Sequence, residues 1–234
     1  ERRGVSARFL RVDGAPPAVY GEWKQPAASR TLLFYAHYDG QPVDASEWTA
    51  TSPFAPALYT APFEAGARKI ELADLPPDSR EVRLYARSAA DDRAPIQAML
   101  TALDWLRSSG AAPGVNLKFF FEGEEERGSG HLREILEANR DLLEADGWLF
   151  CDGPVHQSRR PQVVFGARGS VGLELTVYGA RKELHSGHYG NWAPNPAQML
   201  VNLLATMRRD DGRVTIADFY DGVEPLGDAE LSAI

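Results

Sequence analysis

The sequence has a single cysteine, Cys151, and no long apolar run in its 234 residues. One cysteine cannot form an internal disulfide or a C-x-x-C motif, so we expect a protein of a reducing, cytoplasmic compartment. The longest apolar-rich runs, residues 31–36 and 117–121, are far shorter than the roughly 20 residues that a membrane-spanning helix needs. We therefore expect a protein without a membrane partner.

Positive charge is also in short supply, since 25 basic residues stand against 33 acidic ones and the net charge is −8. Nucleic-acid backbones bind to basic surfaces, so this balance argues against a nucleic-acid partner. The G-x-S-x-G motif of serine hydrolases, the H-E-x-x-H motif of zincins and the phosphate-binding P-loop are all absent. What remains is ordinary globular composition, enough for one large domain or two small ones.

Short β-rich runs alternate with helical patterns along the first two thirds of the chain, which is typical of an α/β fold with a mainly parallel sheet flanked by helices. The predicted strands are residues 31–36, 82–85, 116–121 and 147–151. Each is a continuous run rather than an alternation of apolar and polar residues, as in strands that are covered on both faces. We predict one helix from Pro95 to Gly110 and another that begins with Ser129 as its N-cap.

The pattern changes after Cys151. Residues 161–165 and 171–178 are predicted strands, and the second alternates between apolar and polar side chains as in a sheet with one wet face. A helix is predicted to begin at Asn195 and Pro196 and to continue to Met207. We expect a larger domain over residues 1–165 and a smaller α+β domain over residues 166–234.

Acidic residues and a histidine follow the four predicted strands of the larger domain. They are His37, Asp39, Asp91, Asp92, the acids of residues 122–126, and Asp152. Ligands of an open parallel sheet bind beyond the carboxyl ends of its strands, and so many carboxylates there would repel one another without a cation. Nitrogen and oxygen donors without cysteine suit zinc, or else cobalt or manganese. The spacing of His37 and Asp39 allows Asp39 to orient a ligating imidazole.

Five motifs, in this order, resemble those of the dinuclear zinc peptidases that include glutamate carboxypeptidase, carnosine-type and nonspecific dipeptidases, aminoacylase and succinyl-diaminopimelate desuccinylase. The motifs are H-Y-D at 37–39, A-A-D-D at 89–92, E-G-E-E-E-R-G-S at 122–129, Asp152, and L-H-S-G at 184–187. The resemblance covers residues 31–207. It implies a catalytic domain over residues 1–165 and a partial lid or dimerisation domain over residues 166–234.

The resemblance also implies roles for individual residues. The implied ligands of two zinc ions are His37, Asp91, Glu126 and Asp152, with Asp91 bridging both ions. Glu125 would be the general base, Asp39 would support His37, and His185 would stabilise the developing oxyanion from the partner subunit of a homodimer. The implied reaction is hydrolysis of an amide bond in dipeptides or small peptide-like substrates by a zinc-activated water.

The approach to Asp91 departs from the family pattern. Where the family has G-R-G before the bridging aspartate and K-G after it, this sequence has residues 86–88 as A-R-S and residues 93–94 as R-A. A Cβ atom at a position with positive φ costs energy, so we expect altered loop geometry around Asp91.

A histidine ligand is also missing. The family's second zinc takes a histidine from beyond the lid, and none of the remaining histidines, His131, His156 and His188, stands in the matching context. We expect a truncated chain that holds the second zinc poorly.

Two alternatives to a dipeptidase stay open. One is a deacylase that hydrolyses N-acyl amino acids, and the other is a non-catalytic relative that binds peptide-like ligands without turnover. The presence of both Glu125 and Glu126 favours an enzyme, because a binding protein has no need of a base. The H-Y-D-G-Q-P form of residues 37–42 favours the dipeptidase-like branch.

Overall fold

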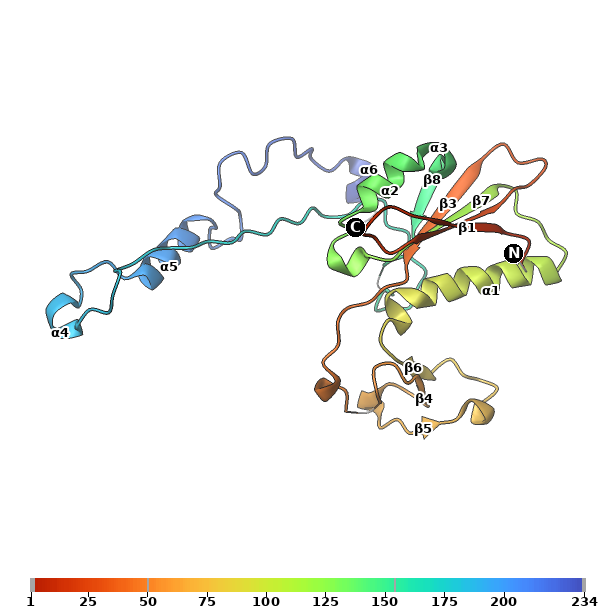
Figure 1. The fold of residues 1–234 in the computed structure, drawn as a ribbon, viewed down its shortest axis with the longest axis horizontal. Helices are drawn as coiled ribbons and strands as arrows, with labels where there is room; N and C mark the ends of the chain where they lie inside the picture. The colour runs from red at the N-terminus through yellow and green to blue at the C-terminus, as the bar shows by residue number, and fades with distance from the viewer. Residues whose placement is uncertain (1–2, 50, 154, 233–234) are drawn as a thin grey trace. The chain divides into compact units, whose positions relative to one another are not determined.

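The structure is a computed structural model that describes residues 3–49, 51–153 and 155–232 (Figure 1). Contacts along the chain separate a first unit, up to residue 162, from a second unit that begins at Val163. The assignment of catalytic and lid domains with a boundary after residue 165 stays a prediction. None of the helices within the described ranges combines the length and the hydropathy of a membrane span.

A five-stranded sheet lies at the centre of the first unit. Its strands, in order across the sheet, are β1 (Ser6–Leu10), β2 (Ala18–Trp23), β7 (Asn116–Glu122), β3 (Thr31–His37) and β8 (Gly147–Phe150). β7 and β8 are both parallel to β3, whereas β2 is antiparallel to both β1 and β7. Four strands therefore run in one direction and β2 alone opposes them, which confirms the mixed α/β fold with a mostly parallel sheet.

Helices cover both faces of this sheet (Figure 1). One face buries Phe120 and Leu33 against α2 (Leu132–Ala138) and α3 (Arg140–Leu143). The other face buries Phe119 with Leu103 of α1 (Ala94–Ser108). Neighbouring side chains of β7 point to opposite faces, so two helical layers explain why consecutive phenylalanines, at 119 and 120, are both buried in this strand.

The predicted helices are present, with one wrong start. Pro95 lies in the first turn of α1, and Gly110 follows its end with a φ of 70°. Ser129 is not the N-cap of the next helix, since α2 begins only after His131. The predicted helix is also interrupted at Asn139, which separates α2 from α3. Ser129 has a φ of 53° instead, because it belongs to the turn that leads from β7 into α2.

The predicted strand over residues 82–85 is wrongly placed in the main sheet. It forms β6 (Arg83–Tyr85) of a separate antiparallel sheet with β4 (Ala57–Tyr59) and β5 (Lys69–Ile70). The rings of Tyr59, Phe63 and Tyr85 pack together there, with centroids 4.1 to 5.5 Å apart. The packing of these rings stabilises the pairing of β6 with β4, so β6 joins this small sheet and not the central one.

The second unit contains α4 (Ser186–Tyr189), α5 (Pro196–Thr206) and α6 (Asp228–Leu231). α5 confirms the predicted helix, and its N-cap Asn195 accepts a hydrogen bond from the backbone N–H of Ala197 at 2.9 Å. The strands predicted at 161–165 and 171–178 are not formed among the described residues. A strand needs a hydrogen-bonding partner, and these segments have none within the described chain, where Phe165 is 98% exposed.

Candidate metal centre

His37 is the last residue of β3 and is almost completely buried, with 1% of its surface exposed. Its Nδ1 atom lies 3.1 Å from Oδ1 of Asp39, and its Nε2 atom lies 2.9 Å from Oδ1 of Asp91. A histidine that ligates a metal typically uses its other ring nitrogen to bond a carboxylate, which fixes the ring. Asp39 is in that position, and Nε2 is left facing the acidic cluster.

Further carboxylates surround the Nε2 atom of His37. Oδ1 of Asp152 lies 3.8 Å from it, and Oε2 of Glu125 lies 3.9 Å from it. Two overlapping groups have ligand atoms within 4.8 Å of one another: His37 with Glu125 and Asp152, and His37 with Asp91 and Glu126. The structure thus brings together the four predicted ligands and the predicted base.

Parallel pairing explains this convergence. The register of β3 and β7 places His37 opposite Glu122, and the register of β3 and β8 places Tyr35 opposite Phe150. The carboxyl ends of these three strands therefore meet at one edge, and the residues that follow them share it. Asp91 reaches the same edge from the small sheet, through the turn at residues 89–93 that leads into α1.

The electrostatics of the cluster favour a bound cation. Burial raises the pKa of Asp152 and of Glu125, and neighbouring carboxylates raise both further. Burial alone lowers the pKa of His37, but the surrounding carboxylates, Asp152 first, outweigh it and raise that pKa overall. A divalent cation relieves such crowding of like charges, and imidazole with carboxylates is a donor set that zinc, cobalt and manganese accept. The residues present therefore fit a metal ion.

Asp92 and Glu122, two of the acids expected at the carboxyl edge of the sheet, make contacts outside the metal-binding groups. Asp92 is buried, and its Oδ2 atom accepts a hydrogen bond from the backbone N–H of His37 at 3.0 Å. Burial raises the pKa of Asp92 to about 6. Glu122 is buried as well, and its Oε2 atom accepts a hydrogen bond from the hydroxyl of Tyr35 at 2.6 Å. Asp92 therefore ties the end of β3 to the turn before α1, and Glu122 faces Tyr35 rather than the metal groups.

Sequence reasoning gave no role to Gln41, which holds Glu126. The Gln41 side chain donates to Oε2 of Glu126 at 2.6 Å, and its backbone N–H donates to Oε1 at 3.2 Å. The backbone N–H of Glu126 donates in turn to Oδ2 of Asp39 at 3.1 Å. The only signal in the sequence was the position of Gln41 in the H-Y-D-G-Q-P run.

The loops at this edge approach one another too closely for extra atoms. A Cβ atom at Gly123 would overlap the ring of Tyr38, and one at Gly40 would overlap the hydroxyl of Ser88. Ser88 is one of the positions where the family pattern has glycine, and its φ is 60°. A non-glycine residue in this left-handed region costs roughly 1–2 kcal/mol. The altered loop is therefore strained at Ser88.

The remaining histidines lie outside these two metal-binding groups. His131 contacts Glu124, His156 contacts Ser158, and His188 packs beside His185. His185 itself belongs to the second unit, where its Nδ1 atom accepts from the backbone N–H of Gly187 at 3.0 Å. A catalytic role for His185, and the missing histidine of a second zinc, stay predictions.

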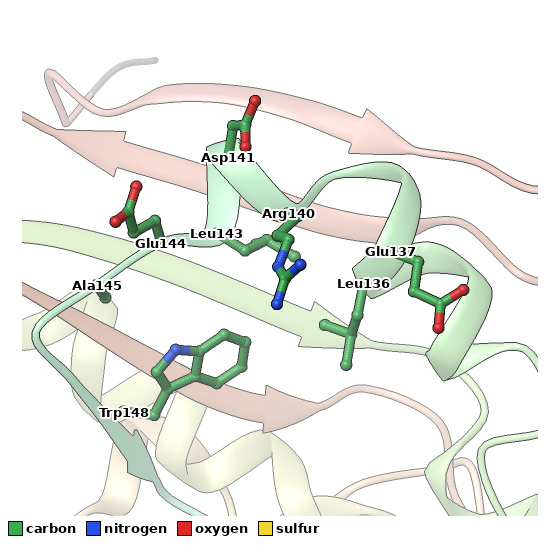
Figure 2. Close-up of a pocket in the computed structure, with 8 residues that line it drawn as sticks. All are labelled: Leu136, Glu137, Arg140, Asp141, Leu143, Glu144, Ala145 and Trp148. Carbon is green, nitrogen blue, oxygen red and sulfur yellow. The ribbon is translucent and has the colours of Figure 1, made fainter.

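A pocket of about 670 Å³ lies away from this centre, between α2, α3 and β8 (Figure 2). Figure 2 shows the Arg140 side chain between Trp148 and Leu136. The carboxylates that line the pocket point in different directions. The carboxylates are Glu137, Asp141 and Glu144. Because they do not converge on one point, the pocket offers no second metal cluster.

Comparison with known proteins agrees with the geometry at the sheet edge. Residues 33–226 match the family model described as Peptidase family M20/M25/M40. The chain belongs to this peptidase family. The match covers residues 33–37 of β3, all of β7 and β8, and all the residues of the candidate metal centre.

Among M20-family relatives, the chain is 29% identical over 238 residues to the Cys-Gly metallodipeptidase dug1 of Schizosaccharomyces pombe, covering 99% of this chain and 45% of that protein. It is 28% identical over 219 residues to the human Beta-Ala-His dipeptidase, covering 93% of this chain and 39% of that protein. The chain thus spans less than half the length of these curated relatives.

A solved M20 structure is also similar to this chain. It is the metallo-carboxypeptidase Sso-CP2 from Sulfolobus solfataricus, with a TM-score of 0.68 and 33% identity, covering 98% of this chain and 47% of that one. Human carnosine dipeptidase 1 has the same fold, with a TM-score of 0.57 and 24% identity, covering 100% of this chain and 48% of that one.

The contact between Gly40 and Ser88 predicts coupled effects on stability. Gly40→Ala should destabilise the protein by about 1–3 kcal/mol, because the new methyl group overlaps the Ser88 hydroxyl. Ser88→Gly should recover most of that loss in the double variant, with a coupling free energy above about 0.5 kcal/mol. Denaturant unfolding of all four proteins measures it. Gly114→Ala is the control, since nothing lies within 4 Å of a Cβ there. Additive effects would contradict the prediction.

The Gln41 contact with Glu126 predicts weaker metal binding in Gln41→Ala. Outer residues that orient a ligand typically contribute 10–100-fold to metal affinity, so we expect a loss of about that size. Competition with a chelator of known affinity measures it in the full-length protein. Gln97→Ala is a matched control, because Gln97 bonds Thr101 within α1. Equal metal affinity in the two variants would show that Gln41 does not orient Glu126.

Proposed function

We propose that the protein is a metal-dependent dipeptidase, which hydrolyses the amide bond of dipeptides or similarly small peptides. The observation that carries this proposal is the convergence of Asp91, Glu125, Glu126 and Asp152 on the buried His37, at the carboxyl edge of the sheet. The names of the relatives, Cys-Gly metallodipeptidase and Beta-Ala-His dipeptidase, support a dipeptide as the substrate.

We infer a pair of zinc ions as the cofactor, with cobalt or manganese as alternatives. His37 and Asp152 would hold one ion, Glu126 would hold the other, and Asp91 would bridge them. These side chains offer imidazole nitrogen and carboxylate oxygen, which zinc accepts in catalytic sites. Such metals, when bound, polarise a substrate carbonyl and lower the pKa of water.

Glu125 is the residue we propose as the general base. It lies in the turn after β7, and its side chain is 37% exposed, so substrate and water can reach it. Burial raises its pKa, which brings its proton affinity closer to that of a base working near neutral pH. Glu125 would take a proton from the attacking water and pass it to the leaving amine.

We propose that His185 completes the site from the partner subunit of a homodimer, where it would donate a hydrogen bond to the developing oxyanion. Exposed apolar side chains of α5 in the same unit support a contact surface there, since Val201 and Leu204 are 57% and 47% exposed. We propose a cytoplasmic location, which the presence of a single cysteine supports. The acidic net charge supports the absence of a nucleic-acid partner, and the shortness of the apolar runs supports the absence of a membrane partner.

Replacement of the proposed base tests the reaction. In the full-length protein loaded with zinc, Glu125→Ala should lower kcat by about 10²- to 10⁴-fold while bound zinc per subunit stays unchanged. Hydrolysis of Cys-Gly, β-Ala-His, other dipeptides and N-acyl amino acids is measured beside zinc content, with Glu137→Ala on α2 as the surface control.

Each outcome of this experiment decides one point. Loss of zinc from Glu125→Ala would show that Glu125 is a ligand and that the roles of Glu125 and Glu126 are exchanged. Cleavage of N-acyl amino acids alone would favour a deacylase, which uses the same chemistry. A zinc-loaded wild-type protein that cleaves nothing in the panel would overturn the proposed function in favour of a binding protein.

Mixed subunits test the role of His185. If His185 acts across the dimer, a mixture of Glu125→Ala and His185→Ala proteins forms hybrids with one intact site. Statistical exchange would then restore about a quarter of the wild-type activity. We expect this restoration, measured after the mixture is incubated long enough for subunits to exchange. Activity that stays at the level of the separate variants, with exchange verified by labelled subunits, would show that His185 does not act in trans.

A further inference from the structure

The loop that carries Glu125 and Glu126 is closed by a contact between its two ends. Glu124 precedes both residues, and its Oε2 atom lies 2.9 Å from Nδ1 of His131. The same atom accepts the backbone N–H of His131 at 3.2 Å, and Oε1 lies 3.1 Å from the His131 ring. One carboxylate thus binds both the backbone and the side chain of a residue seven positions further along.

Backbone hydrogen bonds tighten the same loop. The carbonyl oxygen of Glu124 accepts the N–H groups of Arg127 at 3.1 Å and of Ser129 at 3.0 Å. Gly128 and Ser129, with φ values of 84° and 53°, turn the chain back toward its start. Glu124 therefore fixes the loop twice, through its carbonyl group and through its side chain.

His131 connects this loop to the core of the first unit. It is the N-cap residue of α2, and that helix buries Ile135 against Tyr35 and Phe120 of the sheet. The loop itself has glycines at positions 128 and 130, which give the free chain many conformations. The link to α2 therefore adds to the bonds of Glu126 with Asp39 and Gln41 in setting the directions of the two glutamates.

Glu124 differs from its two neighbours in what it faces. Glu125 and Glu126 both belong to groups of ligand atoms that include His37, and Glu124 belongs to neither group. Its side chain is 18% exposed and that of His131 is 36% exposed, so solvent only partly screens the contact. Of three consecutive acids, the first thus bonds α2 while the other two face the metal centre.

We propose that Glu124 and His131 form a positioning pair, which holds the loop so that Glu125 and Glu126 face His37. This inference rests on the proposed function, because it assigns to the pair the placement of the general base and of one metal ligand. Displacement of a catalytic group by about 1 Å can lower a rate about 10²-fold. Loss of the pair should therefore act on kcat and on metal affinity, while substrate affinity changes little.

Four variants of the full-length, zinc-loaded protein test the pair. Glu124→Ala and His131→Ala each remove the contact and should lower kcat about 10- to 100-fold, with KM within about threefold of wild type. Both should also weaken zinc binding in chelator competition, by about 10-fold or more. Glu124→Gln and His131→Asn keep an acceptor and a donor at the two positions, and should restore kcat to within about threefold of wild type. Glu134→Ala on α2 is the control.

The double variant Glu124→Ala with His131→Ala sharpens the test. If the two residues act as one pair, the double variant should lose no more kcat than either single variant, whereas independent roles would multiply the losses. Thermal unfolding of every variant shows whether a loss of activity reflects loss of folded protein, and His131→Asn serves where an alanine variant does not fold.

Several results would overturn the inference. They are unchanged kcat and zinc affinity in both alanine variants, losses in Glu124→Gln as large as in Glu124→Ala, and multiplicative losses in the double variant. Failure of the proposed function gives a different result. A wild-type protein that shows no turnover can still bind zinc, and its zinc affinity can still fall when Glu124 or His131 is replaced. An active wild-type protein with unaffected variants would refute the positioning pair alone.

Discussion

Mutual repulsion among carboxylates that crowd around one buried imidazole is the constraint on which this structure depends. Asp91, Glu125, Glu126 and Asp152 lie around one buried imidazole, and burial raises the pKa of Glu125 and of Asp152. Such an arrangement is costly without a cation, so every neighbouring element has to hold its acid in place. Hydrogen bonds from outside the two metal-binding groups do this: Asp39 bonds the His37 ring, Asp92 bonds its backbone, and Gln41 bonds Glu126.

The parallel order of β7, β3 and β8 turns that constraint into a site. Parallel strands end at the same edge, and the helices on the two faces leave that edge free for the loops that follow. The same layers bury Phe119 on one face and Phe120 on the other, so the strands that deliver the acids also carry the core. Core and site are therefore built on the same strands.

The structure agrees with the sequence where a signal lay close to a strand. The α/β alternation and the helix at Asn195 are local patterns of this kind. His37, Glu125 and Glu126 come at or soon after the ends of apolar runs, and the structure brings them together, while their roles stay predictions. Prediction from the sequence missed the contacts of Asp92 and Gln41, and it misplaced the strand at residues 82–85, because in each case the partner lies far along the chain or was one of several choices. A polar residue between motif positions shows its partner only after folding.

The amino-acid pattern alone was enough to indicate which residues gather at the carboxyl edge of the sheet, because strand ends, helix caps and residue type are properties of short segments. The three-dimensional arrangement decided which acids face the metal centre and which support it. Glu124 and Glu125 are adjacent and chemically identical, yet one bonds His131 on α2 and the other faces His37. The physical reason is direction: successive side chains leave a tight turn on different sides, and only packed neighbours determine what each side contains.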